Sequence, residues 1–356
     1  MNCWRSNHRS KNKKLKIKSF TEIISPENLF LAWQEFKVDK KKKIDVQEFE
    51  LNLEDNLFRL HYDLKNGIYH HSDYTSFFVH DPKLRHIHKA AVRDRVLHHA
   101  VTRALEPTFE RSFIFDSYSS RLNKGTHRAI KRFRGFARKL SRNNTKTVWI
   151  LKGDIRKYFA SIKHEILLDF IEKKIKEEKL LNLIRQIIFS YQNQPGRGIP
   201  LGNLTSQLFS NIYLNELDQF IKRKLGVKYY IRYADDFVIV DCDQIKLKNI
   251  LKQIDDFLKE KLELEIHPAK TFFRKWHQGF DFLGYVIFPC YLILRIKTKR
   301  RMFWRIKEKN LACLAGKISQ KKANQTLQSY LGLLSHANGH RIELKLNKDY
   351  EFRGGD

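Results

Sequence analysis

The chain has 356 residues, of which 42% are hydrophobic and 30% charged, and this composition is typical of a globular protein rather than a disordered one. Its formal net charge is +30, which predicts a polyanionic partner because self-repulsion of that size destabilises a compact chain. No apolar run is long enough to span a bilayer and no apolar leader is visible, so we expect no membrane partner. The cysteines lie far apart and indicate reduced thiols in a cytoplasmic protein: Cys3, Cys242, Cys290 and Cys313.

The first part of the chain predicts an arm followed by helices. Residues 1–25 begin with a basic, polar stretch that either contacts nucleic acid or is a solvated tail. Apolar residues at helical spacing between Pro26 and Leu64 predict two amphipathic helices, with the charged connection Lys40–Lys43 between them. We expect no catalytic group in this part.

A strand and a basic segment come next. Tyr74–Val79 predicts a short strand, and the segment after it carries Lys83 and Arg85. These cations could bind a triphosphate. The same residues could instead belong to a solvated basic edge strand with no ligand. Apolar spacing from Val92 predicts a helix that Pro107 should end.

Two further features in this region are ambiguous from sequence alone. His98 and His99 lie within the expected helix, and without a nearby ligand pattern they indicate packing or nucleic-acid contacts rather than zinc binding. Farther on, Gly125 allows a sharp turn to which Arg121 and Lys124 bring positive charge. A helix begins after this turn, and its N-terminus could hold phosphate.

The first candidate catalytic residue follows Thr147–Leu151. This segment predicts a buried strand that ends close to Asp154. Phe159 follows, where its ring could lie against a sugar or pack in the core. Residues 194–203 contain three glycines and two prolines and end at a long helix that starts near Thr205. This segment is either a linker or a backbone surface against which a flat ligand can press.

The stretch Tyr230–Val240 has apolar and aromatic residues on both sides of Asp235 and Asp236, which predicts two strands joined by a tight turn. Two ionised carboxylates at one turn repel each other unless a cation neutralises them, although an exposed acidic turn is the alternative. Hard oxygen ligands favour Mg²⁺ or Mn²⁺. With Asp154, the turn would provide the facing carboxylates that a two-metal site needs, with ions roughly 3.5–4 Å apart.

The rest of the chain predicts further strands and then basic helices. An amphipathic helix precedes an expected strand at Leu262–Ile266, and an apolar hairpin is expected from Phe280–Phe288 and Tyr291–Ile296 around Pro289. Basic amphipathic helices begin near Lys297. The order β-α-α-α-β-β-α-β between residues 147 and 266 predicts an α+β fold with helices on one face of an antiparallel sheet, as in ferredoxin-like proteins.

These motifs, in this order, resemble those of reverse transcriptases, and the resemblance runs from about residue 26 to residue 342. It is carried by Gly153–Phe159 as the first palm motif, Gly198–Gly202 as the pocket floor, Tyr233–Asp236 as the catalytic hairpin, Pro268–Lys270 as the next palm motif, and Phe282–Tyr285 as the primer-grip hairpin. The resemblance implies a right-hand polymerase fold. Its parts would be a basic arm (1–25), N-terminal helices and fingers (26–146), a palm with interleaved fingers helices (147–296), and a short helical thumb with the tail (297–356).

The resemblance also implies roles for the acidic residues. Asp154 and Asp235 would bind both Mg²⁺ ions (Mn²⁺ as the alternative), with the carbonyl of Ile155 as a further ligand and Asp236 beside them. Lys270 would protonate the leaving pyrophosphate.

Other residues would bind the incoming deoxynucleoside triphosphate. Lys83 and Arg85, together with Arg121, would grip its phosphates. Phe159 would be the steric gate that rejects a 2′-hydroxyl. Leu201 and Gly202 would contact the nucleotide from the pocket floor, although Leu201 stands where many reverse transcriptases have Gln, a departure that predicts lower fidelity.

Within the superfamily, the chain is most similar to reverse transcriptases of diversity-generating retroelements. The residues that carry this likeness are Ser117–Arg121, Lys124–His127, Leu201–Gln207, Ser329–Gly332 and His336–Asn338. It implies error-prone cDNA synthesis in mutagenic retrohoming, with a template RNA, a cDNA/RNA heteroduplex and a small basic accessory protein as partners. The alternatives are a retron-like or phage-defence reverse transcriptase, or a catalytically idle RNA-binding protein on a polymerase fold.

Overall fold

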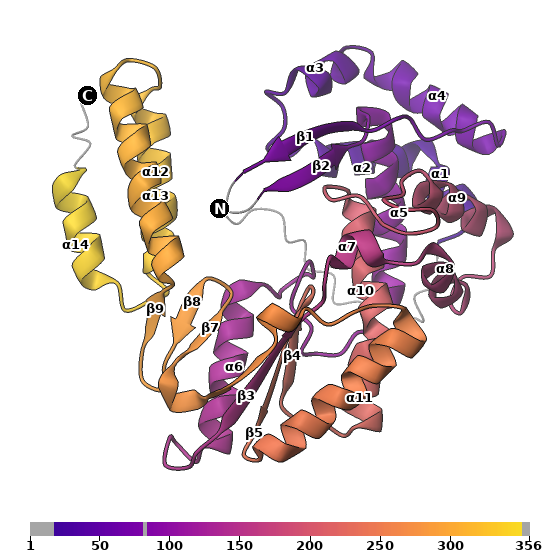
Figure 1. Cartoon of the computed structure of the whole chain (residues 1–356). Helices are drawn as coiled ribbons and strands as arrows, with labels where there is room; N and C mark the ends of the chain where they lie inside the picture. The colour runs from indigo at the N-terminus through magenta and orange to yellow at the C-terminus, as the bar shows by residue number, and fades with distance from the viewer. Residues whose placement is uncertain (1–17, 81–83, 351–356) are drawn as a thin grey trace, which may run out of the picture. The chain divides into compact units, whose positions relative to one another are not determined.

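In a computed structural model of the protein, which describes residues 18–80 and 84–350, the backbone contacts divide the chain into two units (Figure 1). The first unit combines residues 1–115, 155–224 and 254–265, and the second combines residues 116–154, 225–253 and 266–356. This division follows contacts in space, so the four segments expected from the sequence stay a prediction. Among the described residues, no helix is both long and apolar enough to cross a membrane.

The first unit is mainly helical. Its elements are α1 (Phe20–Ile24), α2 (Pro26–Phe36), α3 (Ile44–Leu51), α4 (Leu53–Lys65), β1 (Thr75–Val79), β2 (Arg85–Lys89), α5 (Val92–Glu110), α7 (Tyr158–Ser161), α8 (His164–Glu172), α9 (Glu178–Phe189), α10 (Leu204–Gln219) and the π-helix η1 (Phe220–Lys224). The apolar faces of α2 and α10 pack on α5, which places α5 at the centre of this unit. The predicted strand after residue 74 is confirmed as β1, which pairs with β2 in an antiparallel ribbon.

Three predictions for this unit need correction. The two helices expected before residue 65 are three, because Asn52 leaves helical geometry between α3 and α4. The short helix α1 lies in the part expected as an arm, and Ser19 caps it through a capping box with Glu22. Pro107 does not end α5, which continues to Glu110, since the fixed φ of proline is itself helical and only one backbone donor is lost.

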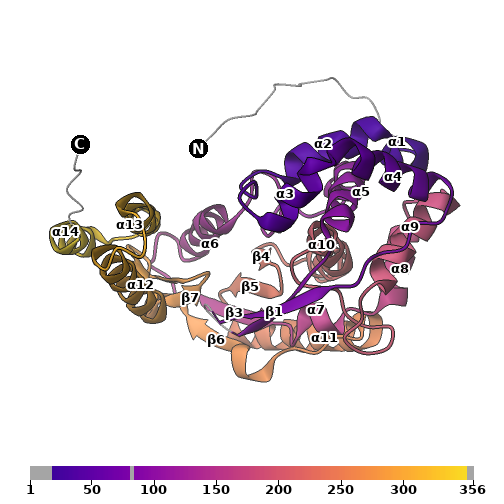
Figure 2. The same ribbon diagram turned by 90° about the horizontal axis from the view of Figure 1, so that it is seen from above.

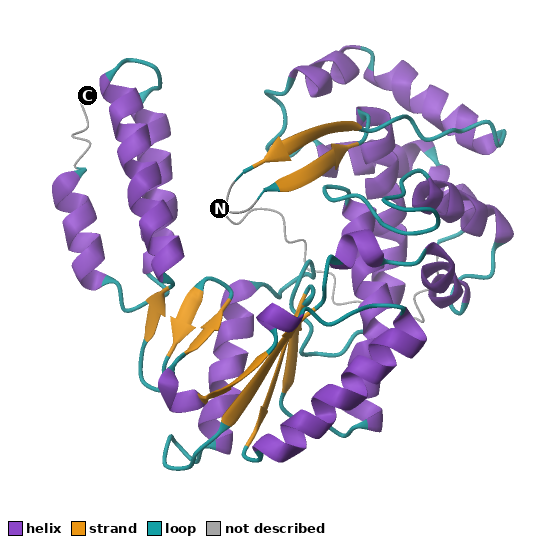
Figure 3. Ribbon diagram, in the orientation of Figure 1, coloured by secondary structure: helices purple, strands orange, loops and turns teal. Residues whose placement is uncertain are grey.

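The second unit contains the sheets. Its elements are α6 (Thr126–Leu140), β3 (Trp149–Asp154), β4 (Tyr230–Tyr233), β5 (Asp236–Asp241), α11 (Gln244–Leu262, which continues into the first unit), η2 (Pro268–Lys270), β6 (Phe272–Lys275), η3 (Trp276–Gln278), β7 (Phe280–Phe282), β8 (Tyr285–Ile287), β9 (Leu292–Leu294), α12 (Ile296–Leu314), α13 (Gln320–Leu334) and α14 (His340–Asp349). One antiparallel sheet has the order β4-β5-β3-β6 and the other has the order β7-β8-β9 (Figure 3).

An aromatic core joins α6 to both sheets of this unit. Phe133 on α6 lies 5.5 Å from Trp276 and 5.0 Å from Phe280, measured between ring centroids. The same buried cluster includes residues of β3, β4, β5 and α12. Figure 2 shows α12, α13 and α14 side by side from above. The basic helices expected after residue 297 are therefore confirmed, and their apolar residues join the core of the second unit.

Two strand predictions in this unit are wrong in detail. Leu262–Ile266 does not form a strand: Leu262 ends α11, and Glu263 adopts a left-handed φ of 47° that breaks the extended chain. The edge strand is β6 instead. The expected strand Phe280–Phe288 is divided into β7 and β8 by a turn at Leu283 and Gly284, whose φ values of 51° and 90° are both positive.

Candidate active site

Three aspartates lie at one end of the four-stranded sheet. Asp154 is the last residue of β3 and is the direct cross-strand partner of Asp236, the first residue of β5. Asp235 lies in the turn between β4 and β5, after Ala234, which has a left-handed φ of 53°. The structure therefore brings Asp154 to the same end of the sheet as Asp235 and Asp236, which follow it in the sequence by about eighty positions.

Two lysines lie beside these carboxylates. Lys270 donates a hydrogen bond from Nζ to Oδ1 of Asp154 at 2.6 Å. The helix η2 that carries Lys270 is held close to β3, since the backbone N–H of His267 donates to the carbonyl oxygen of Asp154 at 2.7 Å. Lys152 Nζ lies 3.3 Å from Oδ1 of Asp236, yet that buried oxygen has no aligned hydrogen-bond donor within the described part of the chain.

The remaining negative charge is concentrated on the turn. Burial raises the pKa of Asp235 to about 6, and the charges of Asp236 and Asp154 add to the effect. Burial also raises the pKa of Asp236, against the opposing charge of Lys152. Two carboxylates with raised pKa values favour a cation at this end of the sheet.

A divalent cation fits the chemistry of this donor set. Carboxylate oxygens are the ligands that Mg²⁺ and Mn²⁺ prefer, and one buried Oδ1 of Asp236 lacks a hydrogen-bond donor. In residues 18–80 and 84–350, no group of three or more His, Cys, Asp or Glu side chains is already arranged to hold a metal ion. The hydrogen bond from Lys270 to Asp154 would have to give way for Asp154 to become a ligand.

The raised pKa of Asp235 predicts a pH-dependent stability of the metal-free protein. A carboxyl with a pKa near 6 in the folded chain and about 4 when unfolded loses folding stability as pH rises between these values, and the loss is complete above pH 6. We expect Asp235→Asn to be more stable than the wild type above pH 6, by on the order of 2 kcal/mol because the side chain is partly exposed. The difference should shrink towards pH 4 in thermal melts recorded with EDTA. A difference that does not change with pH would contradict this assignment.

Two basic residues that the sequence analysis did not single out support the acidic cluster. Lys152, two residues before Asp154, provides the cation beside Asp236. Arg232 is buried in β4 and donates from a guanidinium nitrogen to the carbonyl oxygen of Ala234 at 3.1 Å. This hydrogen bond stabilises the turn that contains Asp235. The position of Arg232 within an otherwise apolar strand could have indicated this role. An Arg is almost never buried without a partner, so a buried partner for its guanidinium group could have been expected.

The predicted nucleotide-binding residues of the first unit lie in two places. Arg85 is the exposed first residue of β2, while Lys83 lies outside the described residues. Phe159 is half-buried in α7, and its carbonyl oxygen accepts a hydrogen bond from the N–H of Ile199 at 2.9 Å. Through that bond, Phe159 is tied to the glycine-rich segment before α10.

Leu201 and Gly202 form a turn next to β2. The carbonyl oxygen of Leu201 accepts from the N–H of His88 at 3.4 Å. Gly202 has a φ of 121°, a conformation that side chains rarely adopt, and a Cβ there would lie 3.5 Å from Ile87 Cγ2. The turn therefore uses a backbone conformation that glycine allows, and one backbone hydrogen bond connects it to β2.

A buried polar network holds the residues that follow this turn. His98 Nδ1 lies 2.5 Å from Oγ1 of Thr205, and its Nε2 lies 3.1 Å from Nε2 of His71. Burial lowers the pKa of His98 to about 3, so its ring is neutral at physiological pH. Asn203 donates to the hydroxyl of Tyr74 at 3.1 Å. His98 is thus a packing residue of the first unit, one of the two roles expected from the sequence.

In the second unit, Arg121 donates to the carbonyl oxygen of Ser117 at 2.8 Å and lies in the turn before α6. Ile155, which follows Asp154 directly, is the first residue of a segment of the first unit, and its side chain is buried. Neither position by itself defines a phosphate or metal contact, so both roles stay predictions.

Comparisons with known proteins identify the family. Residues 79–287 match the family described as reverse transcriptase (RNA-dependent DNA polymerase), a match that includes all three aspartates and Lys270. The chain belongs to the reverse transcriptase family, which is the enzyme class that the sequence motifs predicted.

Individual relatives indicate which reverse transcriptases the chain is similar to. It is 27% identical over 290 residues to the protein YkfC of Escherichia coli (strain K12), which covers 71% of this chain and 72% of that protein. It is 24% identical over 347 residues to the group II intron-encoded protein LtrA of Lactococcus lactis subsp. cremoris, with 74% and 55% covered. The chain therefore spans about half the length of LtrA and is a reverse transcriptase related to the group II intron type.

The fold agrees with this family. The structure of apo telomerase from Candida tropicalis is similar with a TM-score of 0.52 at 12% sequence identity, covering 78% of this chain and 59% of that one. The predicted α+β, right-hand polymerase fold is confirmed.

Proposed function

We propose that this chain is an RNA-directed DNA polymerase that copies an RNA template into cDNA, with its catalytic centre at Asp154, Asp235 and Asp236. The observation that carries the proposal is the strand register that pairs Asp154 with Asp236 and sets Asp235 in the adjoining turn. In this proposal the three carboxylates hold two Mg²⁺ ions, or Mn²⁺, with the carbonyl of Ile155 as a further ligand. Bound there, the ions would activate the primer 3′-hydroxyl and stabilise the charge of the departing pyrophosphate.

The chain's own residues divide the remaining tasks. Lys270 donates a hydrogen bond from Nζ to Asp154 at 2.6 Å, and in the proposal it delivers a proton to the leaving pyrophosphate. Its 40% side-chain exposure supports this role, because the ammonium group is accessible to a ligand. Lys152 remains beside Asp236 and limits the repulsion between the carboxylates.

Binding of the deoxynucleoside triphosphate is assigned to the residues that the sequence resemblance named. Lys83, Arg85 and Arg121 would bind its phosphates, and Phe159 would exclude a 2′-hydroxyl. Leu201 and Gly202 would form the surface under the base pair. The half-buried ring of Phe159 and the fixed turn at Gly202 support rigid, shape-based selection.

Primer extension tests the proposal directly. The full chain is incubated with a DNA primer annealed to an RNA template, the four deoxynucleoside triphosphates and Mg²⁺. We expect primer-dependent DNA synthesis that stops when EDTA is added and that strongly prefers deoxynucleotides over ribonucleotides. Absence of extension with Mg²⁺ and with Mn²⁺, also after addition of a basic accessory protein encoded beside the chain, would refute the proposal.

For the biological role, we propose error-prone cDNA synthesis in a diversity-generating retroelement, with a template RNA and a small basic accessory protein. The sequence segments Ser117–Arg121 and Leu201–Gln207 support this assignment. The similarity to LtrA favours, as the second candidate, an enzyme of the intron or retron type, with a defence role as one form of it. A template and variable repeat pair beside the gene would support the first candidate, and a structured noncoding RNA would support the second.

The fidelity of cDNA synthesis by a Leu201 variant tests the first candidate, the error-prone enzyme of a diversity-generating retroelement. An apolar side chain cannot donate or accept a hydrogen bond at the base pair, so replacing it with an amide should tighten selection. We expect Leu201→Gln to lower misincorporation by about tenfold, the effect of roughly 1.4 kcal/mol of added discrimination. Sequencing of cDNA products gives the error spectrum. Unchanged errors, especially opposite template adenine, would remove Leu201 as the cause of low fidelity.

A further inference from the structure

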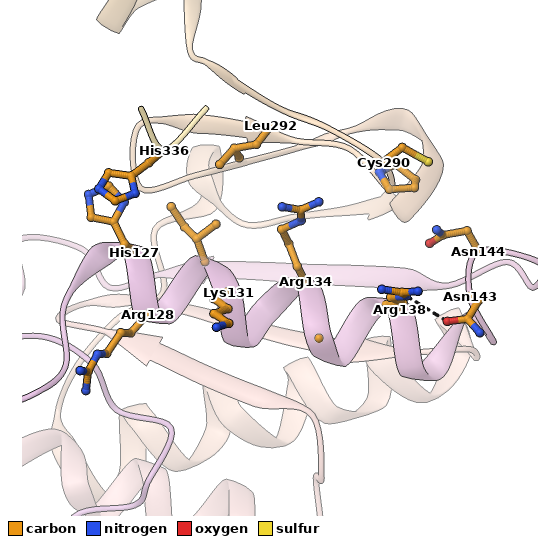
Figure 4. A pocket seen from close by; sticks show the side chains of 13 residues that line it. His127, Arg128, Lys131, Arg134, Arg138, Asn143, Asn144, Cys290, Leu292 and His336 are labelled. Atoms are coloured by element: carbon orange, nitrogen blue, oxygen red, sulfur yellow. Dashed lines mark hydrogen bonds between the residues drawn. The ribbon is translucent and has the colours of Figure 1, made fainter. Parts of the chain in front are cut away.

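The second unit has a cavity of about 780 Å³ that the proposed polymerase reaction does not use (Figure 4). One wall is α6, and the opposite wall contains Cys290, between β8 and β9, and Leu292, the first residue of β9. Asn143 and Asn144, in the turn after α6, close one end, and His127 and His336 lie at the other. None of the three aspartates lines it.

The wall formed by α6 carries four cations: Arg128, Lys131, Arg134 and Arg138. Steps of three and four residues place their side chains on one face of the helix, and the row covers about 15 Å of its length. No acidic side chain lines the cavity, and none of the four forms an ion pair with another described residue. By contrast, Arg132 on the same helix is paired with Asp116 at 2.8 Å.

The cavity is built on a fixed scaffold. The other face of α6, with Phe133 and Ala137, is fully buried in the core of the second unit. Arg138 donates from Nε to Oδ1 of Asn143 at 2.9 Å, which orients its guanidinium group (Figure 4). Asn144 accepts from the indole N–H of Trp276 at 2.9 Å, so the turn is anchored to the core as well.

The cavity also offers surfaces suited to bases. The imidazole rings of His127 and His336 stack with their centroids 3.7 Å apart. Ile130 on α6 and Leu292 on the opposite wall supply apolar lining beside the cations. Cations in a row beside aromatic and apolar groups are the combination that binds single-stranded nucleic acid.

We propose that this cavity binds a single-stranded segment of RNA, separate from the template–primer duplex at the catalytic carboxylates. A row of four cations that have no acidic partner among the described residues is longer than one phosphate group requires, whereas successive phosphates of a strand match repeated charges along a helix. The choice of RNA over DNA rests on the proposed function, because an RNA template is the strand that the reaction supplies. The site would hold an unpaired part of that RNA to the enzyme while copying proceeds elsewhere.

Salt-dependent binding to the full chain measures the contribution of the row. The probe is a fluorescent single-stranded RNA of about twenty nucleotides, and the variant is Arg128→Gln, Lys131→Gln and Arg134→Gln combined. The slope of log K against log salt should fall by about 2, since each neutralised phosphate on a single strand contributes about 0.7. The affinity at low salt should fall at least tenfold. The control variant Lys41→Gln, Lys42→Gln and Lys43→Gln removes the same charge from an exposed loop and should change the slope much less.

Cys290 reports occupancy of the cavity itself. It is exposed and lines the cavity, whereas Cys242 is exposed and does not. We expect the RNA to slow maleimide labelling of Cys290 at least fivefold in the wild type and to leave Cys242 unchanged. The protection should be lost in the α6 variant, whose extension of a short, preformed RNA–DNA duplex should match the wild type.

Three outcomes would overturn the proposal: equal slopes for the two variants, no protection of Cys290, or stronger protection by polyglutamate than by RNA. Polyglutamate protection would indicate an acidic protein as the occupant instead. Failure of the proposed polymerase function is a separate result, because it would show as absent primer extension while protection of Cys290 can still be read.

Discussion

Replacing Asp235 with alanine is expected to lower the rate of primer extension about 10²–10³-fold, the scale on which loss of a preorganised electrostatic group lowers kcat. Asp235 lies in the turn directly before Asp236, and Asp236 pairs with Asp154 across the strands. Its raised pKa of about 6 shows that the folded chain holds this carboxylate at an electrostatic cost, which a bound cation would offset. Single-turnover extension of a primer on an RNA template, at saturating Mg²⁺ and deoxynucleotides, measures the loss.

A matched control separates this effect from a general loss of charge. Asp241 lies at the other end of the same strand β5 and forms an exposed ion pair with Lys246 at 2.8 Å. Asp241→Ala should leave extension within about threefold of the wild type, because exposed ion pairs contribute little to stability. Thermal melts should show that Asp235→Ala is folded and, without metal above pH 6, no less stable than the wild type. Extension by Asp235→Ala within tenfold of the wild type would exclude Asp235 as a metal ligand.

Local sequence patterns predicted the hairpin that carries Asp235 and Asp236 well for a physical reason. In β4 and β5, burial, β-branched residues and a two-residue turn all favour the same structure, and no distant contact is needed to select it. Asp154 at the end of a buried strand was also predictable. The expected facing partner of Asp154 was Asp235, whereas its direct cross-strand partner is Asp236, which only the sheet order β4-β5-β3-β6 establishes.

Other features depend on contacts that a linear pattern does not contain. Alternating residues predicted a strand at Leu262–Ile266, but Glu263 instead turns and hydrogen-bonds Lys163 at 2.6 Å, a residue one hundred positions away. Lys152 and Arg232 were missed because their partners, the carboxylate of Asp236 and the carbonyl of Ala234, become neighbours only in the folded sheet. Strand alternation and charge alone do not reveal such partners.

The last prediction concerns Gly153, which allows β3 and β5 to approach each other beside Asp154 and Asp236. Gly153 is the cross-strand partner of Phe237, and a Cβ added to it would lie 2.0 Å from Cζ of that ring and 2.5 Å from Cε1. Phe237 is fully buried, so its ring cannot move away without displacing the core. We expect Gly153→Ala to lower the free energy of unfolding by about 3 kcal/mol, the upper part of the usual range for overpacking. Chemical denaturation gives this value.

The same substitution should reduce activity more than the unfolded fraction explains. Asp154 and Asp236 are the next pair in this register, so any separation of β3 from β5 at Gly153 moves one carboxylate away from the other. The double variant Gly153→Ala, Phe237→Leu removes the ring atoms that clash and should recover part of both the stability and the primer extension. As a control, Gly135→Ala on α6 meets no atom within 4 Å and should stabilise the protein by roughly 0.5–1 kcal/mol. If Gly153→Ala is as stable and as active as Gly135→Ala, the close approach of these strands does not position the carboxylates of Asp154 and Asp236.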